Sequence, residues 1–348
     1  MNLQIALLLG QDGMTNGAVY ALLALSIVLV FTVTRVLLVP QGEFVTFGAM
    51  TMAALQAGQA PRLAWLVFGV ALLHFLQRAW ESRRGAACED GPLRWRDARG
   101  LLYALALLAL TRWAAQASLP LLAQVALTLA LVVPLGPWLY DLCFRPIAAA
   151  HGLVLLIVSI ALHVVLVGVA LLMFGAEGAR TEPFSEVGLQ LGPVMLKSQT
   201  LWVLAVTLAL IAGLFLYFER SLRGKALRAT AVSRLGAQLM GISPAQAGRS
   251  CFALAALIGA LSGVLIAPLT TLYYDSGFLI SLKGFVGAVV GGLVSFPVGA
   301  LGALGVGLVE AFSTFWASAF KEVIVFTLIL PFLLWRSLSA GRVEEEHA

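Results

Sequence analysis

Residues 219–249 read ERSLRGKALRATAVSRLGAQLMGISPAQAGR, the most basic polar stretch of an otherwise apolar chain. Its single acid, Glu219, is accompanied by Arg220, Arg223, Lys225, Arg228, Arg234 and Arg249. Apolar segments precede and follow the stretch, and positive charge beside membrane spans marks the cytoplasmic side. The sequence therefore predicts a cytoplasmic segment between two spans.

The same stretch carries helix signals. Val232, Leu235 and Leu239 recur at helical spacing, and Gly241 can end that turn. Ser243-Pro244 is typical of an N-cap followed by proline at the first helical position. We expect a short amphipathic helix, and two interpretations stay open: a basic loop that only sets topology, or a docking helix for a soluble partner.

Composition sets the fold class. The 348 residues are 61% hydrophobic and 11% charged, with a mean hydropathy of +0.97, whereas soluble domains carry about a quarter charged residues. The chain must therefore be surrounded mainly by lipid. Helices are the expected structure in lipid, because each helix forms all of its backbone hydrogen bonds within itself. We predict an all-α polytopic transmembrane helix bundle of about 8–10 spans, some short or broken. The net charge of +5 does not indicate nucleic-acid binding, because the basic residues lie in loops between apolar runs.

Topology follows from these spans. The first apolar run lacks a basic flank and is expected to be retained. The expected spans are 15–34, 44–57, 63–80, 101–118, 121–142, 152–174, 200–218, 250–269, 298–315 and 323–335. With the basic stretch inside, the N-terminus lies outside and the C-terminus is cytoplasmic. Most of the 22 basic residues then face the cytoplasm, as expected for an inner-membrane protein. Residues 337–348 are predicted to form a loose tail.

The second span is predicted to be broken. Pro40 and Gly42 precede it closely, and Gly48 interrupts it. A short, broken span with an acid at one end can line a transport pathway, which would make Gly42 and Glu43 pathway residues. The alternative is that Glu43 is solvated at the membrane interface. His163, within another span, is interpreted as a packing residue rather than a ligand.

The C-terminal third is rich in glycine. Gly259 and Gly263 form a GxxxG pair that permits close helix contact, and residues 283–295 are dense in glycine but short for a span. Glu310 lies inside a predicted span, so it is either a pathway residue or a packing residue held by a neighbouring hydroxyl.

Enzyme chemistry is not indicated. The sequence contains no GxxxxGK[ST] phosphate loop and no HExxH or paired Cys/His cluster. We therefore expect no enzymatic activity, no metal and no cofactor. A long bundle with intramembrane glycines and a basic inner segment suggests transport driven by the energy of another subunit.

Several stretches resemble permease subunits of the branched-chain amino acid group of ATP-binding-cassette importers. They are 16–22 (NGAVYAL), 41–49 (QGEF followed by GA), 144–146 (FRP), 224–229 with 240–242, and 283–311 with its glycine-rich pattern. The sequence departs from the family at Leu38, where an Asn is usual, and at Pro40, where a small residue is usual. Residues 60–118, with the charged loop 81–100, are expected to be an insertion.

The resemblance implies a mechanism and partners. It implies a single permease domain over 1–348, with 219–249 as the coupling segment. An extracytoplasmic solute-binding protein would deliver a branched-chain or related amino acid, a second permease would pair with this one, and two cytoplasmic ATP-binding subunits would dock on the coupling segment. The coupling residues would be Arg223, Gly224, Lys225, Arg228 and Gly241. Urea or short amides are an alternative solute class, and an ion-coupled secondary transporter is an alternative outside the family.

Overall fold

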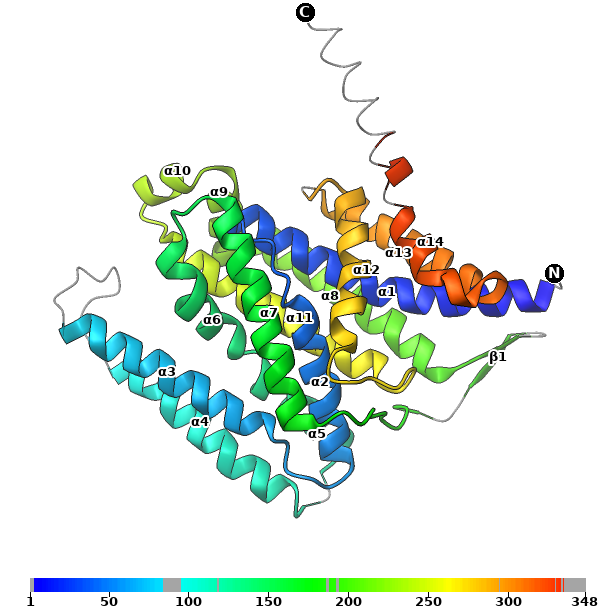
Figure 1. Cartoon of the computed structure of the whole chain (residues 1–348), viewed down its shortest axis with the longest axis horizontal. Helices are drawn as coiled ribbons and strands as arrows, with labels where there is room; N and C mark the ends of the chain where they lie inside the picture. The colour runs from blue at the N-terminus through cyan, green and yellow to red at the C-terminus, as the bar shows by residue number, and fades with distance from the viewer. Residues whose placement is uncertain are drawn as a thin grey trace, which may run out of the picture. The chain divides into compact units, whose positions relative to one another are not determined.

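The computed structural model (Figure 1) describes residues 3–83, 95–117, 119–185, 188–191, 194–293, 295–328, 330–332 and 334. These residues are mostly helical, with a small hairpin of β1 (Leu189–Leu191) paired antiparallel with β2 (Val194–Leu196). The predicted all-α polytopic bundle is confirmed. The tail predicted at 337–348, and residues 84–94 of the predicted charged loop, lie outside the described residues.

Seven helical segments of the described chain are long and apolar enough to cross a membrane. They are α1 (Leu3–Thr34), α3 (Leu63–Arg83), the run from α5 (Leu121–Val132) to Ile147, α7 (Gly152–Phe174), α8 (Ser198–Arg220), α11 (Pro244–Ile266) and α13 (Phe296–Trp316). Three of the ten expected spans, 44–57, 101–118 and 323–335, are not among the seven found in the described residues. α2 (Gln41–Gln56) and α12 (Ser276–Val290) have 16 and 15 residues, fewer than the ~20 that a bilayer requires.

The break after the first span is confirmed, but its start differs from the expectation. α1 begins at Leu3 instead of Thr15, because the leucine- and alanine-rich N-terminal residues continue the helix. It ends at Thr34, and Arg35 takes a positive φ of 59°. Residues 35–40 are irregular, and α2 follows directly after Pro40. α2 is continuous through Gly48, so the predicted interruption of the second span at Gly48 is wrong.

The chain divides into two compact units. Unit 1 comprises Met1–Val28, Phe184–Gly213 and Leu279–Ala348, and unit 2 comprises Leu29–Pro183 and Leu214–Phe278. α1, α8 and α12 contribute residues to both units. Each unit is described by itself below.

Unit 2 is built around α2, most of whose residues are buried. It packs closely on α11. A Cβ on Gly48 would lie 2.8 Å from Ala260 Cα, one on Gly259 would lie 2.7 Å from Phe44 Cβ, and one on Gly263 would overlap the carbonyl of Val45. The close contact predicted for the glycine pair of α11 is therefore confirmed, since only glycine lets these two backbones approach so far.

The helix after residue 121 is interrupted, as its prolines predict. α5 ends at Val132, and α6 (Leu135–Leu139) begins after Pro134. A π-helical turn (Tyr140–Phe144) and a 3₁₀ turn (Arg145–Ile147) complete the run. These turns direct Asp141 and Arg145 toward the neighbouring helices, as described below.

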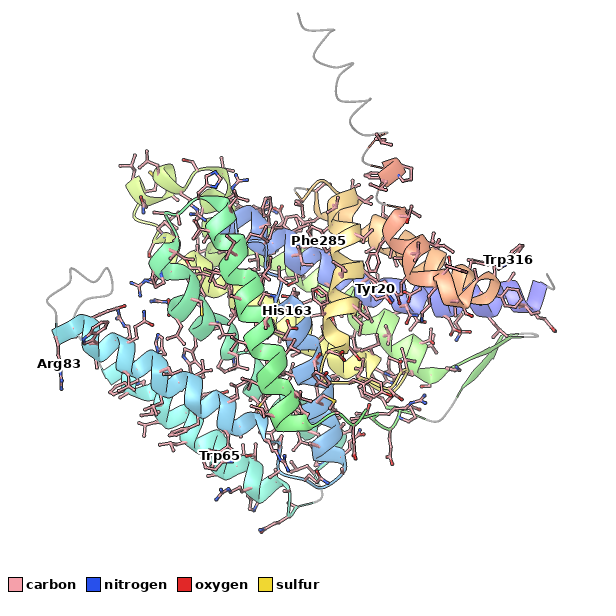
Figure 2. The ribbon with its side chains drawn as sticks, viewed as in Figure 1. Tyr20, Trp65, Arg83, His163, Phe285 and Trp316 are labelled. Atoms are coloured by element: carbon pink, nitrogen blue, oxygen red, sulfur yellow. The ribbon has the colours of Figure 1, made fainter. Side chains whose placement is uncertain are left out.

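α3 runs beside α4 (Trp95–Ala114) in the segment expected to be an insertion (Figure 1). Arg112 of α4 is exposed, and its guanidinium lies 5.6 Å from the ring centroid of Trp65, which Figure 2 labels on α3. This cation–π contact lets the long Arg112 side chain lie along an apolar surface with its charged end exposed.

Unit 1 contains α13, most of α12 and the first part of α1, with η3 (Ser318–Phe320) and α14 (Lys321–Thr327). The glycines of α12 and α13 allow close contact, because a Cβ on Gly287 would lie 2.6 Å from Ala303 Cα. Gly292, with a φ of 68°, forms the turn between the two helices. On α1, a Cβ on Gly13 would lie 2.9 Å from Leu308 Cα.

Candidate functional sites

The basic stretch folds as two helices, α9 (Leu222–Val232) and α10 (Arg234–Leu239). The expected single amphipathic helix is therefore wrong. Ser233 has extended backbone angles, closes α9 and caps α10, where its hydroxyl accepts a hydrogen bond from Gly236 N at 3.0 Å. A serine satisfies the free N–H groups of a new helix better than it continues an old one, which explains the break.

The other boundaries follow the sequence signals. Gly241 has a φ of 78° and ends α10, while Ile242 N donates to Ala237 O at 2.9 Å, the bond pattern of a left-handed C-terminal cap. Ser243 caps α11, with Pro244 at its first position, as predicted. Glycine is favoured at 241 because side chains strain a left-handed backbone.

Gly224 is a packing residue of this segment. It is buried, and a Cβ there would lie 2.7 Å from Phe218 Cα and overlap the carbonyl of Tyr217. Ser221 caps α9 by accepting from Gly224 N at 2.9 Å. Glycine at 224 thus lets α9 turn back tightly against the end of α8.

The basic residues of α9 face outward. Arg223, Lys225 and Arg228 are exposed, and Arg228 Nη2 lies 2.8 Å from Glu219 Oε1 in an exposed ion pair. Such a pair contributes little to stability, typically below about 1 kcal/mol. These side chains are therefore available to a partner at little cost to the fold.

Apolar side chains are also exposed at the other end of the segment. Val232 is 87% exposed, Leu235 is 69% exposed, and Leu239 and Met240 are each 81% exposed. Together they form an apolar patch on α10 and its borders. Contiguous exposed apolar surface marks an interaction site, and polar residues around it distinguish this patch from a lipid-facing span.

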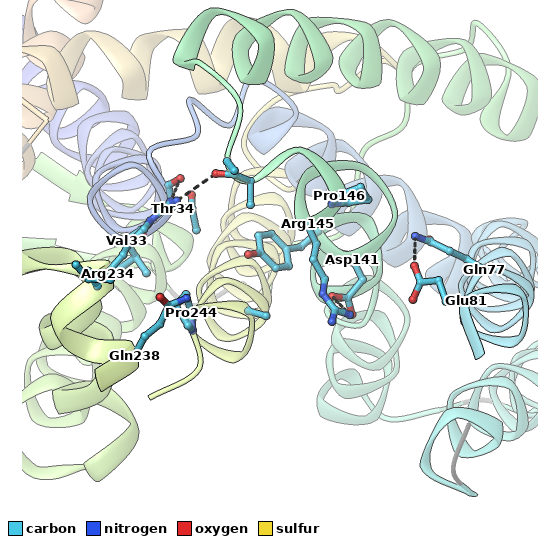
Figure 3. Close-up of a pocket in the computed structure, with 15 residues that line it drawn as sticks. Val33, Thr34, Gln77, Glu81, Asp141, Arg145, Pro146, Arg234, Gln238 and Pro244 are labelled. Atoms are coloured by element: carbon cyan, nitrogen blue, oxygen red, sulfur yellow. Dashed lines mark hydrogen bonds and ion pairs between the residues drawn. The ribbon is translucent and has the colours of Figure 1, made fainter. Parts of the chain in front are cut away.

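Arg234 behaves differently from the other basic residues. Its guanidinium donates to the carbonyl oxygens of Thr34 and Val33, at the C-terminal end of α1, and to that of Ala148. A cation at this position interacts favourably with the negative end of the helix dipole. Arg234 therefore fixes α10 onto the body of unit 2, beside the pocket shown in Figure 3.

Glu43 is buried in unit 2 and pairs with His163. The residue is 1% exposed, and its Oε1 lies 2.8 Å from Nδ1 of His163, which Figure 2 labels on α7. The ring of His163 stacks on Phe278, with centroids 4.5 Å apart. The second carboxylate oxygen, Oε2, is buried and has no hydrogen-bond partner among the described residues. The interpretation of Glu43 as a solvated interfacial acid is therefore wrong.

Ser159, one turn before His163, holds the broken segment that leads to Glu43. Its hydroxyl donates to Leu37 O at 2.7 Å and accepts from Val39 N at 2.9 Å. Gly42 fits tightly, because a Cβ there would overlap the carbonyl of Gly277 at the start of α12. The break is thus a fixed structure, and α7 positions the segment through two side chains.

Glu310 lies in a buried network of unit 1. Lys283 Nζ donates to its Oε1 at 2.5 Å, and the hydroxyl of Tyr20, labelled in Figure 2, donates to its Oε2 at 2.6 Å. Lys283 also donates to Glu322 Oε1 at 3.1 Å. Lys283 is 5% exposed, so its ammonium is buried together with the carboxylate of Glu310.

Sequence reasoning selected both buried acids, and its alternative of a hydroxyl partner for Glu310 agrees with the contact from Tyr20, but it did not identify which residues are the partners. His163 was interpreted as a packing residue, and Lys283 and Tyr20 were not selected. One signal was present: an ionisable side chain within a span needs a partner, and His163 and Lys283 are polar residues in apolar surroundings. Which acid each one meets depends on helix packing. Among the described residues, no cluster of His, Cys, Asp and Glu has the arrangement of a metal site.

Comparison with known proteins identifies relatives. The family described as "Branched-chain amino acid transport system / permease component" matches residues 98–333. The chain is 28% identical over 243 residues to the high-affinity branched-chain amino acid transport system permease protein BraD of Pseudomonas aeruginosa, covering 66% of this chain and 78% of that protein. It is 32% identical over 136 residues to the corresponding permease protein LivH of Escherichia coli K12, covering 38% of this chain and 44% of LivH. No solved structure matches significantly.

Proposed function

The chain belongs to the family of branched-chain amino acid transport system permease components, and from this premise we propose that it is the membrane-spanning permease of an ATP-driven importer for branched-chain or related amino acids. It is a multi-pass inner-membrane protein. Its proposed orientation has the N-terminus outside and the C-terminus in the cytoplasm, which puts α9 and α10 inside.

The exposed surface of α9 and α10 is the observation that supports this function best. It presents Arg223, Lys225 and Arg228 on one helix and the apolar patch on the next. Apolar residues surrounded by charge are typical of a protein-binding surface. We propose that this permease pairs with a second, related permease, and that two cytoplasmic ATP-binding subunits bind the pair. One of these subunits would dock on α9 and α10. A solute-binding protein would deliver the amino acid outside.

A rigid connection to the spans would transmit the movement of the docked subunit. α9 is held to α8 at Gly224 and begins directly after it, and α11 follows Gly241 by three residues. A short segment fixed at both ends can pass a rigid-body displacement to both helices. In this proposal Gly224 and Gly241 maintain the backbone geometry, and the exposed residues make the contact.

The proposed pathway residue in unit 2 is Glu43. Its Oε2, which has no hydrogen-bond partner among the described residues, is a strong acceptor inside a membrane protein, and the ammonium group of an amino acid would match it. Gly42 and Glu310 were also predicted to line the pathway. That role stays a prediction for both, and their present contacts favour packing roles.

Co-purification tests the docking proposal. The tagged protein is solubilised gently from cells that express the whole transport system, and the ATP-binding subunit is quantified in the eluate. Leu235→Asp with Leu239→Asp should remove most of it, because two carboxylates would be buried in the contact. Arg223→Glu with Arg228→Glu should weaken retention in a salt-dependent way. Arg62→Glu, which reverses an exposed charge on the proposed outer side, is the matched control.

Two outcomes would contradict the proposal. Retention of the ATP-binding subunit by the double aspartate variant would show that α10 is not the docking surface. Absence of any ATP-binding subunit from the wild-type protein would contradict the importer and favour the secondary transporter. Uptake of labelled leucine and labelled urea into cells then separates the two solute classes.

A further inference from the structure

Arg234 holds α10 through the backbone carbonyls of two separate segments of unit 2. Its Nη2 donates to Thr34 O and, at 3.4 Å, to Val33 O, and its Nη1 donates to Ala148 O at 3.3 Å. Figure 3 shows Arg234 beside Val33 and Thr34 at the end of α1. Carbonyls at the end of a helix lack partners within that helix, and the planar guanidinium carries enough donors to bind several of them at once.

The inner and outer faces of α10 have different surroundings. Arg234 is half-buried and Ala237 is buried on the inner face. Leu235 and Leu239 are exposed on the outer face and belong to the apolar patch. Because α10 is a helix of only six residues, a partner that moves the patch moves Arg234 with it.

A cavity of about 720 Å³ lies beside the contact between Arg234 and α1 (Figure 3). Thr34, Arg234 and Leu235 line this cavity, and Glu81 and Arg145 also border it. Close-packed interiors resist displacement, whereas a volume of this size leaves room for α10 to shift. The hydrogen bonds of Arg234 then decide whether the end of α1 follows that shift.

The end of α1 leads directly into the break before Glu43. Arg35 has a positive φ of 59°, a conformation that is uncommon for a residue with a side chain. Val36 N donates to Thr34 Oγ1 at 3.3 Å, which fixes the first turn of the break. α2 begins directly after the break and carries Glu43 in its first turn. Arg234 therefore contacts the chain at the start of the segment that ends at Glu43.

The third carbonyl connects the same guanidinium to α7. Ala148 lies in the turn before α7, which begins at Gly152. α7 carries Ser159, whose hydroxyl holds the break through two hydrogen bonds. It also carries His163, whose Nδ1 lies 2.8 Å from Glu43 Oε1. One side chain of α10 therefore contacts both elements that position Glu43.

We propose that Arg234 is a positioning residue that couples the docked ATP-binding subunit to Glu43. When the subunit displaces α10, the guanidinium would carry the end of α1 and the turn before α7 with it, which would reorient Glu43 toward or away from the solute. This inference rests on the proposed function, because it requires an ATP-binding subunit on α10. Contiguous contacts carry coupling only where both ends respond together, so coupling itself has to be measured.

The amount of leucine imported per ATP hydrolysed measures this coupling. The permeases and ATP-binding subunits are reconstituted in proteoliposomes with the solute-binding protein, and both rates are measured on the same preparation. Arg234→Ala should retain the ATP-binding subunit and hydrolyse ATP, but import about tenfold less leucine per ATP, within the range of about 5–150-fold for coupling between two sites. Arg234→Lys keeps the charge but loses the planar fork, so its ratio should lie between those of Arg234→Ala and the wild type.

Arg180 provides a matched control on the proposed outer side of the membrane. Its guanidinium also donates to a backbone carbonyl just beyond a helix, that of Pro268 after α11, at 3.1 and 3.0 Å. Arg180→Ala should lower the midpoint of thermal unfolding about as much as Arg234→Ala, but leave the leucine imported per ATP unchanged. A lower midpoint with an unchanged ratio in both variants would show that Arg234 only stabilises α10, and would overturn the proposal.

Cysteine labelling follows the movement of the break itself. Arg35 is exposed, so Arg35→Cys can be labelled with a maleimide in a background whose three native cysteines are replaced by alanine. A non-hydrolysable ATP analogue should change the labelling rate when Arg234 is present, and this change should be lost with Arg234→Ala and reduced with Arg234→Lys. A change of equal size with and without Arg234 would overturn the proposal.

The outcomes separate failure of the inference from failure of the proposed function. Loss of the ATP-binding subunit from Arg234→Ala would make Arg234 a docking residue, and a wild-type ratio of leucine to ATP in that variant would show that the contact is not needed for coupling. Either result overturns the inference and leaves the proposed function intact. Absence of ATP-driven leucine import by the wild-type protein would count against the proposed function itself.

Discussion

Glu43 and Glu310 are both carboxylates buried inside helices of a membrane protein, but their surroundings differ. Glu310 has a partner on each oxygen, Lys283 on one and Tyr20 on the other. Glu43 has one partner, His163, and its second oxygen is buried without one among the described residues. Buried polar atoms are normally hydrogen-bonded, so Glu43 keeps an acceptor oxygen that no described residue uses, whereas Glu310 does not.

The number of partners on a buried carboxylate indicates whether the acid stabilises the fold or is available to bind a solute. A satisfied network such as that of Glu310 holds helices together, and removing one member leaves a buried charge uncompensated. A half-satisfied acid such as Glu43 can exchange water or a ligand group without dismantling the fold. Both acids are buried, so burial does not distinguish them. They differ in how many of their carboxylate oxygens have a hydrogen-bond partner among the described residues.

Removing Lys283 should have the largest effect. Lys283→Met leaves Glu310 without its cation, which we expect to cost about 3–5 kcal/mol of unfolding free energy. Thermal unfolding in detergent measures this loss, and Lys321→Met, which removes a half-buried lysine of α14 outside the network, is the control. Adding Glu310→Gln to Lys283→Met should recover part of the stability. An unchanged unfolding midpoint for Lys283→Met would show that the network does not stabilise the protein.

Glu43→Gln should alter transport more than stability. Glutamine keeps an oxygen toward His163 but removes the charge, so we expect leucine uptake per folded protein to fall about tenfold, equivalent to about 1.4 kcal/mol, with a nearly unchanged unfolding midpoint. Glu310→Gln should give the opposite result, a lower midpoint with uptake per folded protein retained. Full uptake by Glu43→Gln would remove Glu43 from the proposed pathway.

Ser159→Ala tests whether α7 positions the break before Glu43. Loss of the hydrogen bonds to Leu37 and Val39 should cost about 1 kcal/mol. Ser262→Ala provides a matched control, because the Ser262 hydroxyl is equally buried but has no hydrogen-bond partner in the described part of the chain. It should be neutral or slightly stabilising. Equal changes in unfolding free energy for the two variants would show that the hydrogen bonds of Ser159 do not stabilise the protein.

Much of the fold is predictable from local pattern. The break at Pro40, the interruption around Pro134, the cap at Ser243 and the close contact at Gly259 and Gly263 all follow from residue types whose backbone preferences are strong. The division of α9 from α10 was missed. The apolar spacing of Val232, Leu235 and Leu239 continues through Ser233, so the pattern favoured one helix although the serine favoured a cap.

The sequence by itself determined that this chain is an all-α membrane permease with a basic segment between two spans, because hydropathy, charge placement and turn residues are local properties. Only the tertiary structure decided that Glu43 meets His163, that Glu310 meets Lys283 and Tyr20, and that Arg145 and Glu81 border one cavity. These partners are separated by many residues in the sequence. Their meeting depends on how helices rotate and cross, which is set by the combined packing of glycine-lined faces.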